Sequence, residues 1–173
     1  YWTMTADQLF ARMYKEYQRF WNEERRAKAQ AIGLTPVEVA TLASIVASET
    51  NKTSEHPLIA SLYLNRLNKG IALQACPTVI YAVGNFKMRR VLKRHLTIDS
   101  PYNTYKNRGL PPGPIRLARP DVMDAVLNAP KTDYLYMCAN PDFSGTHIFS
   151  SNYTKHSAVA RQYQRELNQR KVK

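Results

Sequence analysis

The sequence has little cysteine, few acidic residues and no long apolar run. Its two cysteines, Cys76 and Cys138, lie far apart, and neither has a second Cys or a His at ligand spacing, so we expect no metal site and no cofactor. They are either buried thiols or one disulfide, and their spacing in the sequence does not distinguish these two alternatives. No apolar run approaches the ~20 residues that a transmembrane helix needs. Because the chain begins at Tyr1, we interpret it as part of a longer precursor and the missing anchor as uninformative.

Charge is strongly unbalanced. The 173 residues include 25 Lys and Arg but 13 Asp and Glu, which gives a formal net charge of +12. Such an excess favours anionic partners: nucleic acid, acidic lipid or a carboxylate-bearing polymer. The basic residues are scattered, and neither zinc-finger spacing nor an RNA-binding aromatic motif accompanies them, so nucleic acid is not an expected partner. An apolar content of 44% is ordinary for a soluble globular domain.

The N-terminal region predicts one long helix. Thr5 with Gln8 three residues later is a capping-box pattern that opens the helix, and we expect it to end at Gly33. Apolar residues recur along it at helical spacing and predict a packing surface, with stacking on a sugar as the alternative. The members of this stripe are Leu9, Phe10, Met13, Tyr14, Tyr17, Phe20 and Trp21.

Downstream patterns predict more helices and a small amount of strand. Helices are expected over 35–49, where Thr35, Pro36 and Glu38 are three agreeing start signals, and over 57–70. The residues of the second of these helices expected to face inward are Ile59, Leu62, Tyr63 and Leu67. The segment 76–84 fits either a short helix or a strand.

The second half of the chain combines a long loop, two helices and a hairpin. The proline-rich segment 99–120 predicts one long ordered loop, and loops of this length in compact domains are usually functional. A helix is expected from Pro120 to before Pro130, then a hairpin formed by "DYLYMCAN" and "THIFSS", then a final helix over 154–169. The fold class is therefore α+β: mainly helical, with a small antiparallel hairpin.

An acid interrupts the apolar stretch "LASIVASET". On a helix, Leu42, Ile45 and Val46 share one face, and Glu49 continues that face one turn later. A carboxyl group there loses water, which raises its pKa, and a protonated carboxyl is what a general acid for glycosidic cleavage requires. The alternative is that Glu49 turns outward at the helix end and pairs with a basic residue.

A second carboxylate for hydrolysis is hard to find. Glycoside hydrolysis normally uses two carboxylates. Glu55, Asp99 and Asp142 fall in predicted connections and are candidates, but none forms a recognisable pair with Glu49. A mechanism with one carboxylate is the consequence, and it needs a substrate that supplies its own nucleophile.

Several ordered blocks carry a family resemblance. They are "LASIVASET", "LYLNRL", "LQACPTVIYAVG", "SPYNTYKNRGLPPGPI" and "YLYMCANPDFSGTHIFSSNYTKH". Over roughly residues 34–164 they resemble the catalytic domain of the endolytic murein transglycosylase family, also called MltG or YceG-like. The resemblance implies an N-terminal helix over 1–33 that leads into a catalytic domain over 34–173.

The resemblance implies an activity and a catalytic residue. The family cleaves the β-1,4 bond between N-acetylmuramic acid and N-acetylglucosamine inside peptidoglycan, and the muramic C6 hydroxyl attacks to leave a 1,6-anhydro end. The family's catalytic glutamate corresponds to Glu49, which would first protonate the leaving oxygen and then deprotonate that hydroxyl. Since the attacking hydroxyl belongs to the sugar, no second carboxylate is required.

Other residues of these blocks gain expected roles in substrate binding. They are Gln74, Asn103, Tyr102, Tyr105, Tyr81, His147 and Ser150. Gln74 and Asn103 would recognise N-acetyl or hydroxyl groups, with a turn or cap as the alternative for Asn103. The tyrosines would stack on sugars or pack the loop, and His147 has a structural alternative. Asn65 and Arg66 are expected to brace the catalytic helix.

Two positions depart from the family pattern. Relatives commonly have an acid two residues before the glutamate, where this chain has Ala47, and Asp before the Pro-Thr pair, where it has Cys76. These losses are expected to shift the pH response or the preference for stem peptides. Neither removes Glu49, so activity remains the expectation.

The resemblance also implies a setting. Family members are usually tethered by an N-terminal membrane helix, so we expect action at the periplasmic face of the cytoplasmic membrane, on peptidoglycan strands and beside cell-wall synthases. The alternatives are a muramidase that uses water, with Asp99 or Asp142 as second carboxylate, and a peptidoglycan-binding module without catalysis. Anhydro ends, reducing ends or no cleavage would distinguish the three.

Overall fold

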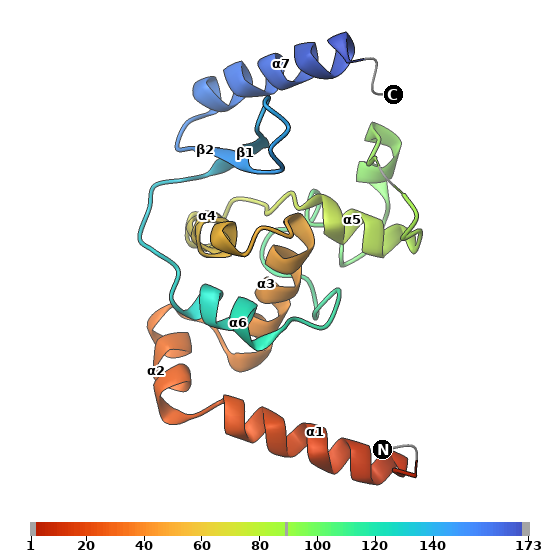
Figure 1. The fold of residues 1–173 in the computed structure, drawn as a ribbon, viewed down its shortest axis with the longest axis vertical. Coiled ribbons are helices and arrows are strands. Elements are labelled where there is room, and N and C mark those ends of the chain that lie inside the picture. Colours follow the sequence, from red (N-terminus) through yellow and green to blue (C-terminus); the bar gives the residue numbers. More distant parts are fainter. Residues whose placement is uncertain (1–2, 89, 171–173) are drawn as a thin grey trace.

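The structure is a computed structural model that describes residues 3–88 and 90–170. The described chain is mainly helical with one antiparallel hairpin, which confirms the predicted α+β class (Figure 1). Its elements, in order, are α1 (Ala6–Phe20), α2 (Glu23–Ala31), α3 (Pro36–Glu49), η1 (Thr53–Glu55), α4 (His56–Asn68), α5 (Cys76–Val83), η2 (Lys93–Thr97), α6 (Pro120–Leu127), β1 (Tyr136–Ala139), β2 (His147–Ser150) and α7 (Tyr153–Gln169).

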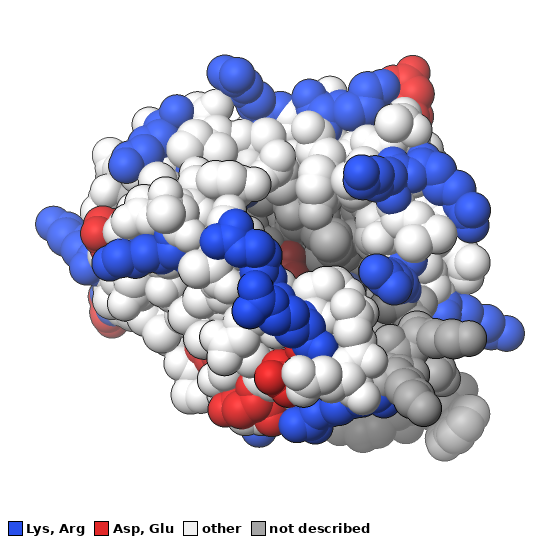
Figure 2. All heavy atoms as spheres, turned by 90° about the horizontal axis from the view of Figure 1, so that it is seen from above, with Lys and Arg blue, Asp and Glu red and all other residues white. Residues whose placement is uncertain are grey.

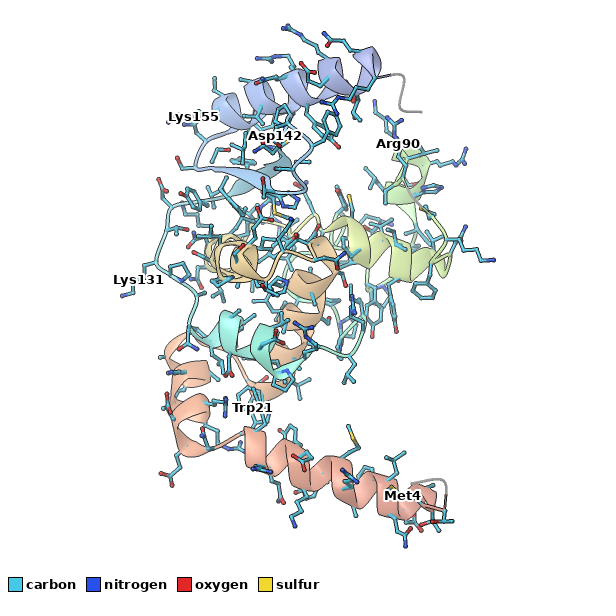
Figure 3. The ribbon with its side chains drawn as sticks, in the orientation of Figure 1. Met4, Trp21, Arg90, Lys131, Asp142 and Lys155 are labelled. Atoms are coloured by element: carbon cyan, nitrogen blue, oxygen red, sulfur yellow. The ribbon has the colours of Figure 1, made fainter. Side chains whose placement is uncertain are left out.

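The N-terminal helix is broken, and the prediction of one helix to Gly33 is wrong. α1 ends at Phe20, and Asn22 starts α2 as an N-cap whose side chain accepts a hydrogen bond from the Arg25 N–H at 2.9 Å. The break directs the Trp21 side chain into the core, where 3% of it is exposed (Figure 3). Burial of this large ring outweighs the helical periodicity that continues through it.

The apolar stripe of α1 does not pack as predicted. α1 extends from the body at the end opposite α7 (Figure 1), and it buries none of its residues within the described chain. Phe20 packs against the core, and Met13, Tyr17 and Phe20 line a cavity together with the segment 114–120 and Met123 of α6. Periodicity identified the apolar face correctly, but most of this face is exposed in the described chain.

α3 is the centre of the core. Its start is the predicted capping box, in which the Glu38 carboxylate accepts from the Thr35 N–H and the Glu38 N–H bonds the Thr35 hydroxyl. The residues Val39, Leu42, Ile45 and Val46 are fully buried. α3 packs against α4, α5 and α6, so its C-terminal end is held among these helices.

The chain after α4 supplies much of the wall around the end of α3. Segment 76–84 is helical, and the loop before α6 is irregular as predicted but anchored, because the Ile115 N–H donates to the Ser44 hydroxyl of α3 at 3.0 Å. The predicted hairpin is present, with Tyr136 opposite Ser150 and Ala139 opposite His147, and α7 packs on it (Figure 1). Within the described residues, no single helix is long and apolar enough to cross a membrane.

Candidate active site

A cavity of about 300 Å³ lies between the end of α3, helices α4 and α5, and the hairpin with α7. The face seen from the α7 side is hollowed near its centre, and Lys and Arg side chains surround the hollow (Figure 2). The lining residues are Glu49, Leu62, Tyr63, Arg66, Leu73, Gln74, Cys76, Tyr105, Tyr136, Met137, Cys138, Ala139, His147 and His156. Glu49 is the one carboxylate among them.

Glu49 is the last residue of α3 and faces this cavity. The Tyr63 hydroxyl of α4 donates a hydrogen bond to Glu49 Oε1 at 2.6 Å. Burial raises the pKa of Glu49, while the Tyr63 hydrogen bond and the positive charge that His147 carries when it is protonated act in the opposite direction. The raised pKa predicted from the apolar face is confirmed, and the outward-turned alternative is wrong. Glu49 therefore holds a proton to higher pH than an exposed glutamate.

Tyr63→Phe is expected to raise the pKa of Glu49 further. The phenol stabilises the carboxylate form of Glu49, and phenylalanine keeps the ring while it removes that hydrogen bond. The change is measured by NMR titration of the Glu49 side-chain carboxyl in both proteins. A pKa that stays constant or falls in Tyr63→Phe would show that the hydroxyl does not control this proton.

A second cavity, of about 320 Å³, adjoins the first at Glu49. Glu49 and His147 line both cavities, so these two residues stand at the boundary between them. The remaining lining residues of the second cavity are Ser48, Thr50, Asn51, Lys52 and Gly145. An extended substrate that filled both cavities would pass directly over Glu49.

The Arg66 guanidinium joins the walls of the first cavity. It is 7% exposed and donates to the carbonyl oxygens of Leu135, Ala72 and Leu73 at 2.6 to 3.0 Å. It also donates to Gln74 Oε1 at 3.3 Å, and burial lowers its own pKa. Arg66 thus braces the strand segment and the α4–α5 connection, whereas the sequence assigned it to the catalytic helix.

Three of the seven predicted binding residues meet Glu49 in the first cavity: Gln74, Tyr105 and His147. Gln74 has a positive φ of 54°, a conformation that non-glycine residues rarely adopt and that often marks a functional position. The Tyr105 hydroxyl lies 3.2 Å from Cys76 Sγ, and burial raises the pKa of Tyr105. These residues can supply amide, phenol and imidazole groups to a polar substrate.

The other four predicted residues lie outside the cavity lining. Tyr81 and Tyr102 pack against each other with ring centroids 4.7 Å apart. Ser150 is buried, and its carbonyl accepts from the Leu135 N–H at the end of the hairpin. Asn103 is fully buried, with its side chain engaged by the backbone of its own loop. The turn alternative for Asn103 describes its contacts, so we regard it as a positioning residue for Tyr105.

Asn103→Ala is expected to lower the free energy of unfolding by about 2–3 kcal/mol, because buried groups lose their hydrogen-bond partners. The Asn103 amide donates to the carbonyls of Leu96 and Ile98, and its oxygen accepts from the Tyr105 N–H. Urea unfolding measures the loss. The control is Asn85→Ala at an exposed turn, expected to change stability by less than about 0.5 kcal/mol. Equal losses in both variants would contradict the role of Asn103.

Sequence reasoning missed several cavity residues. Tyr63 was predicted to face inward, but periodicity gives no sign that its hydroxyl meets Glu49. His156 of α7 lines the cavity, and its Nδ1 is buried without a partner among the described residues. Cys76 and Cys138 are both free thiols that line the cavity, so the disulfide alternative is wrong. Cys76 is exposed and Cys138 is half-buried, so they are not the buried thiols of the other alternative. The sequence placed Cys76 in a family block, but no pattern placed His156 or Cys138 in the site.

The three candidate second acids do not reach the first cavity. Asp99 is exposed and pairs with Lys106, and Asp142 accepts from the Ser144 N–H in the hairpin turn below α7 (Figure 3). Glu55 is buried behind His147. In the described part of the chain, no group of three or more His, Cys, Asp or Glu side chains could hold a metal ion.

The fold and the site define a class. The chain matches the YceG-like family over residues 1–162, and it therefore belongs to this family. The match begins before residue 34, so the predicted division of the chain at residues 33 and 34 stays a prediction.

Particular relatives support the same placement. The chain is 41% identical over 133 residues to the endolytic murein transglycosylase of Bacillus subtilis (strain 168), which covers 77% of this chain and 36% of that relative. It is 33% identical over 167 residues to the endolytic murein transglycosylase of Streptococcus pneumoniae serotype 2 (strain D39 / NCTC 7466), covering 94% and 29%. A crystal structure of a yceG-like protein from Listeria monocytogenes is similar, with a TM-score of 0.79, 35% identity, and coverage of 90% of this chain and 50% of that one. The chain thus spans about a third of the length of the two transglycosylases.

Proposed function

We propose that this chain is the catalytic part of a lytic transglycosylase that cleaves the bond between N-acetylmuramic acid and N-acetylglucosamine inside peptidoglycan strands. The observation that carries the proposal is Glu49: a carboxyl with a raised pKa, held by Tyr63, and the one carboxylate among the described residues that line its cavity. Two relatives are named endolytic murein transglycosylase, which supports the same reaction.

The chemistry needs a proton donor and an internal nucleophile. Glu49 protonates the leaving O4 oxygen, and the C6 hydroxyl of the muramic residue closes on C1 to give the 1,6-anhydro end. Water is not consumed, so no second carboxylate is needed to activate it. The exposed positions of Asp99 and Asp142 do not favour the muramidase alternative, in which one of them would activate water.

The experiment is digestion of purified peptidoglycan, followed by mass spectrometry of the products. The expected products carry anhydromuramyl ends, which weigh one water less than reducing ends. Reducing ends would identify a hydrolase, and intact strands would leave a binding module. Either result overturns the proposed function.

The setting is part of the proposal. Since the substrate lies outside the cytoplasmic membrane, we place the enzyme at the periplasmic face of that membrane, anchored through a segment outside this chain and near cell-wall synthases. The net charge of +12 fits a substrate rich in carboxylates. Fractionation of cells that express the whole protein tests the location.

A further inference from the structure

A buried carboxylate stands behind the boundary of the two cavities. Glu55, at the end of η1, is 6% exposed. Its Oε1 accepts from the backbone N–H of His147 at 2.6 Å, and its Oε2 lies 2.9 Å from His147 Nδ1. The Thr50 hydroxyl donates to the same Oε2 at 3.3 Å. Glu55 therefore fixes both the backbone and the ring of His147.

This contact determines which nitrogen of His147 is free. A carboxylate has acceptors alone, so Nδ1 carries a proton, and Nε2 of the neutral ring keeps a lone pair. The His147 side chain is 17% exposed and lines both cavities together with Glu49. With Nδ1 engaged by Glu55, the Nε2 edge is left for a substrate that lies over Glu49.

Other titratable or charged groups around Glu49 lack this combination of a free lone pair and an orienting carboxylate. They are Lys52, Tyr63, Arg66, Cys76, Tyr105, Tyr136, Cys138 and His156. Lys52 and Arg66 are cations, and the Tyr63 proton is directed at Glu49. Within the described chain, His156 has no carboxylate partner for its ring. A base held by a hydrogen-bonded third group is the usual arrangement for proton abstraction in enzymes.

We propose that His147, oriented by Glu55, is the general base that takes the proton from the attacking hydroxyl, while Glu49 serves as the acid alone. The inference rests on the proposed function and divides between two residues the roles that the family resemblance gives to one glutamate. His147 is a catalytic residue in this scheme, and Glu55 is a positioning residue.

The step balances without any co-reactant. The bond between O6 and C1 of the muramic residue forms as the bond between C1 and O4 breaks. The O6 proton passes to His147 Nε2, and the Glu49 proton passes to O4. The imidazolium then returns a proton to the Glu49 carboxylate through solvent, which restores both groups for the next cleavage.

The test is the pH dependence of glycan cleavage by the wild-type chain, His147→Gln and Glu55→Gln, with His95→Gln as control. His95 lies in η2, away from both cavities. General base catalysis contributes about 10²–10⁴-fold, so His147→Gln is expected to lose at least about 100-fold in kcat with KM little changed. The rate of the wild-type chain is expected to fall at both low and high pH. A general base acts only when it is unprotonated, so His147→Gln is expected to lose the fall at low pH and to keep the one at high pH. Glu55→Gln loses about tenfold or more, since an orienting carboxylate contributes up to about 10⁴ in kcat.

Chemical rescue provides a second readout. His147→Gly is expected to regain activity when imidazole is added, whereas Glu49→Gln is not. A kcat loss with both pH limbs intact and no rescue identifies a structural role for His147 and overturns the inference, as does loss of a limb in His156→Gln instead. If wild-type digests contain no anhydro ends, the proposed function itself fails before any variant is compared.

Discussion

Glu49→Gln is expected to lower the rate of peptidoglycan cleavage by at least about 10³-fold, because the leaving oxygen loses its proton donor. Glutamine keeps the shape of the side chain and can still meet the Tyr63 hydroxyl, but it has no titrating proton. The release of anhydromuropeptides is measured by mass spectrometry under identical loading of both proteins. The matched control is Glu24→Gln on the exposed side of α2, which is expected to cleave at the wild-type rate.

The fold of Glu49→Gln is expected to remain intact. As pH rises, the variant is expected to become more stable relative to the wild type. The folded chain raises the pKa of Glu49, so its contribution to stability is complete below the unfolded pKa and is lost as pH rises through the folded pKa. Glutamine stays neutral throughout. The difference in Tm, variant minus wild type, should therefore grow with pH. Wild-type turnover by the variant would remove Glu49 from the mechanism.

Arg66→Met is expected to lower the free energy of unfolding by about 3–5 kcal/mol. Hydrogen bonds from a charged donor contribute about 1.5–3 kcal/mol each, and water that enters the site replaces part of what is lost. Three backbone carbonyls and Gln74 lose their donor at once. Methionine keeps much of the apolar stem, so the change reports mainly on the guanidinium.

The matched control is Arg119→Met. Arg119 makes an ion pair with Asp121 in which both side chains are largely exposed, and such pairs contribute at most about 1 kcal/mol. Chemical denaturation of the two variants gives both values under the same conditions. A loss in Arg66→Met no larger than in Arg119→Met would contradict the bracing role. Arg66→Lys should fall between them, because an ammonium cannot reach all four acceptors.

Local signals made the secondary structure largely predictable. The capping box of Thr35 and Glu38 and the proline at position 36 place the start of α3 where the structure has it. The alternation on both sides of "PDFSG" identified the hairpin. The failure at Trp21 has a physical reason: an Asn N-cap and the burial of one ring override a periodic pattern that runs through them.

The site was predictable only in part. The position of Glu49 on the apolar face of its helix was enough to predict a buried carboxyl with a raised pKa. The side-chain contacts of the site were not predictable in this way. Periodicity predicted only that Tyr63 faces inward, and the sequence placed Glu55 only as an acid in a connection, with no sign that Tyr63 meets Glu49 or that Glu55 meets His147. Asn103 lies in the right loop, yet its side chain supports the backbone there.

What the sequence determined by itself is helices α3, α4, α6 and α7, the hairpin and the apolar helix face on which Glu49 lies, since caps, prolines and periodicity act over a few neighbouring residues. The tertiary structure alone decided what Glu49 meets. Tyr63 reaches it from the next long helix, and the Glu55–His147 contact joins residues 92 positions apart. Such contacts depend on how whole elements pack around the core, and no local pattern encodes that geometry.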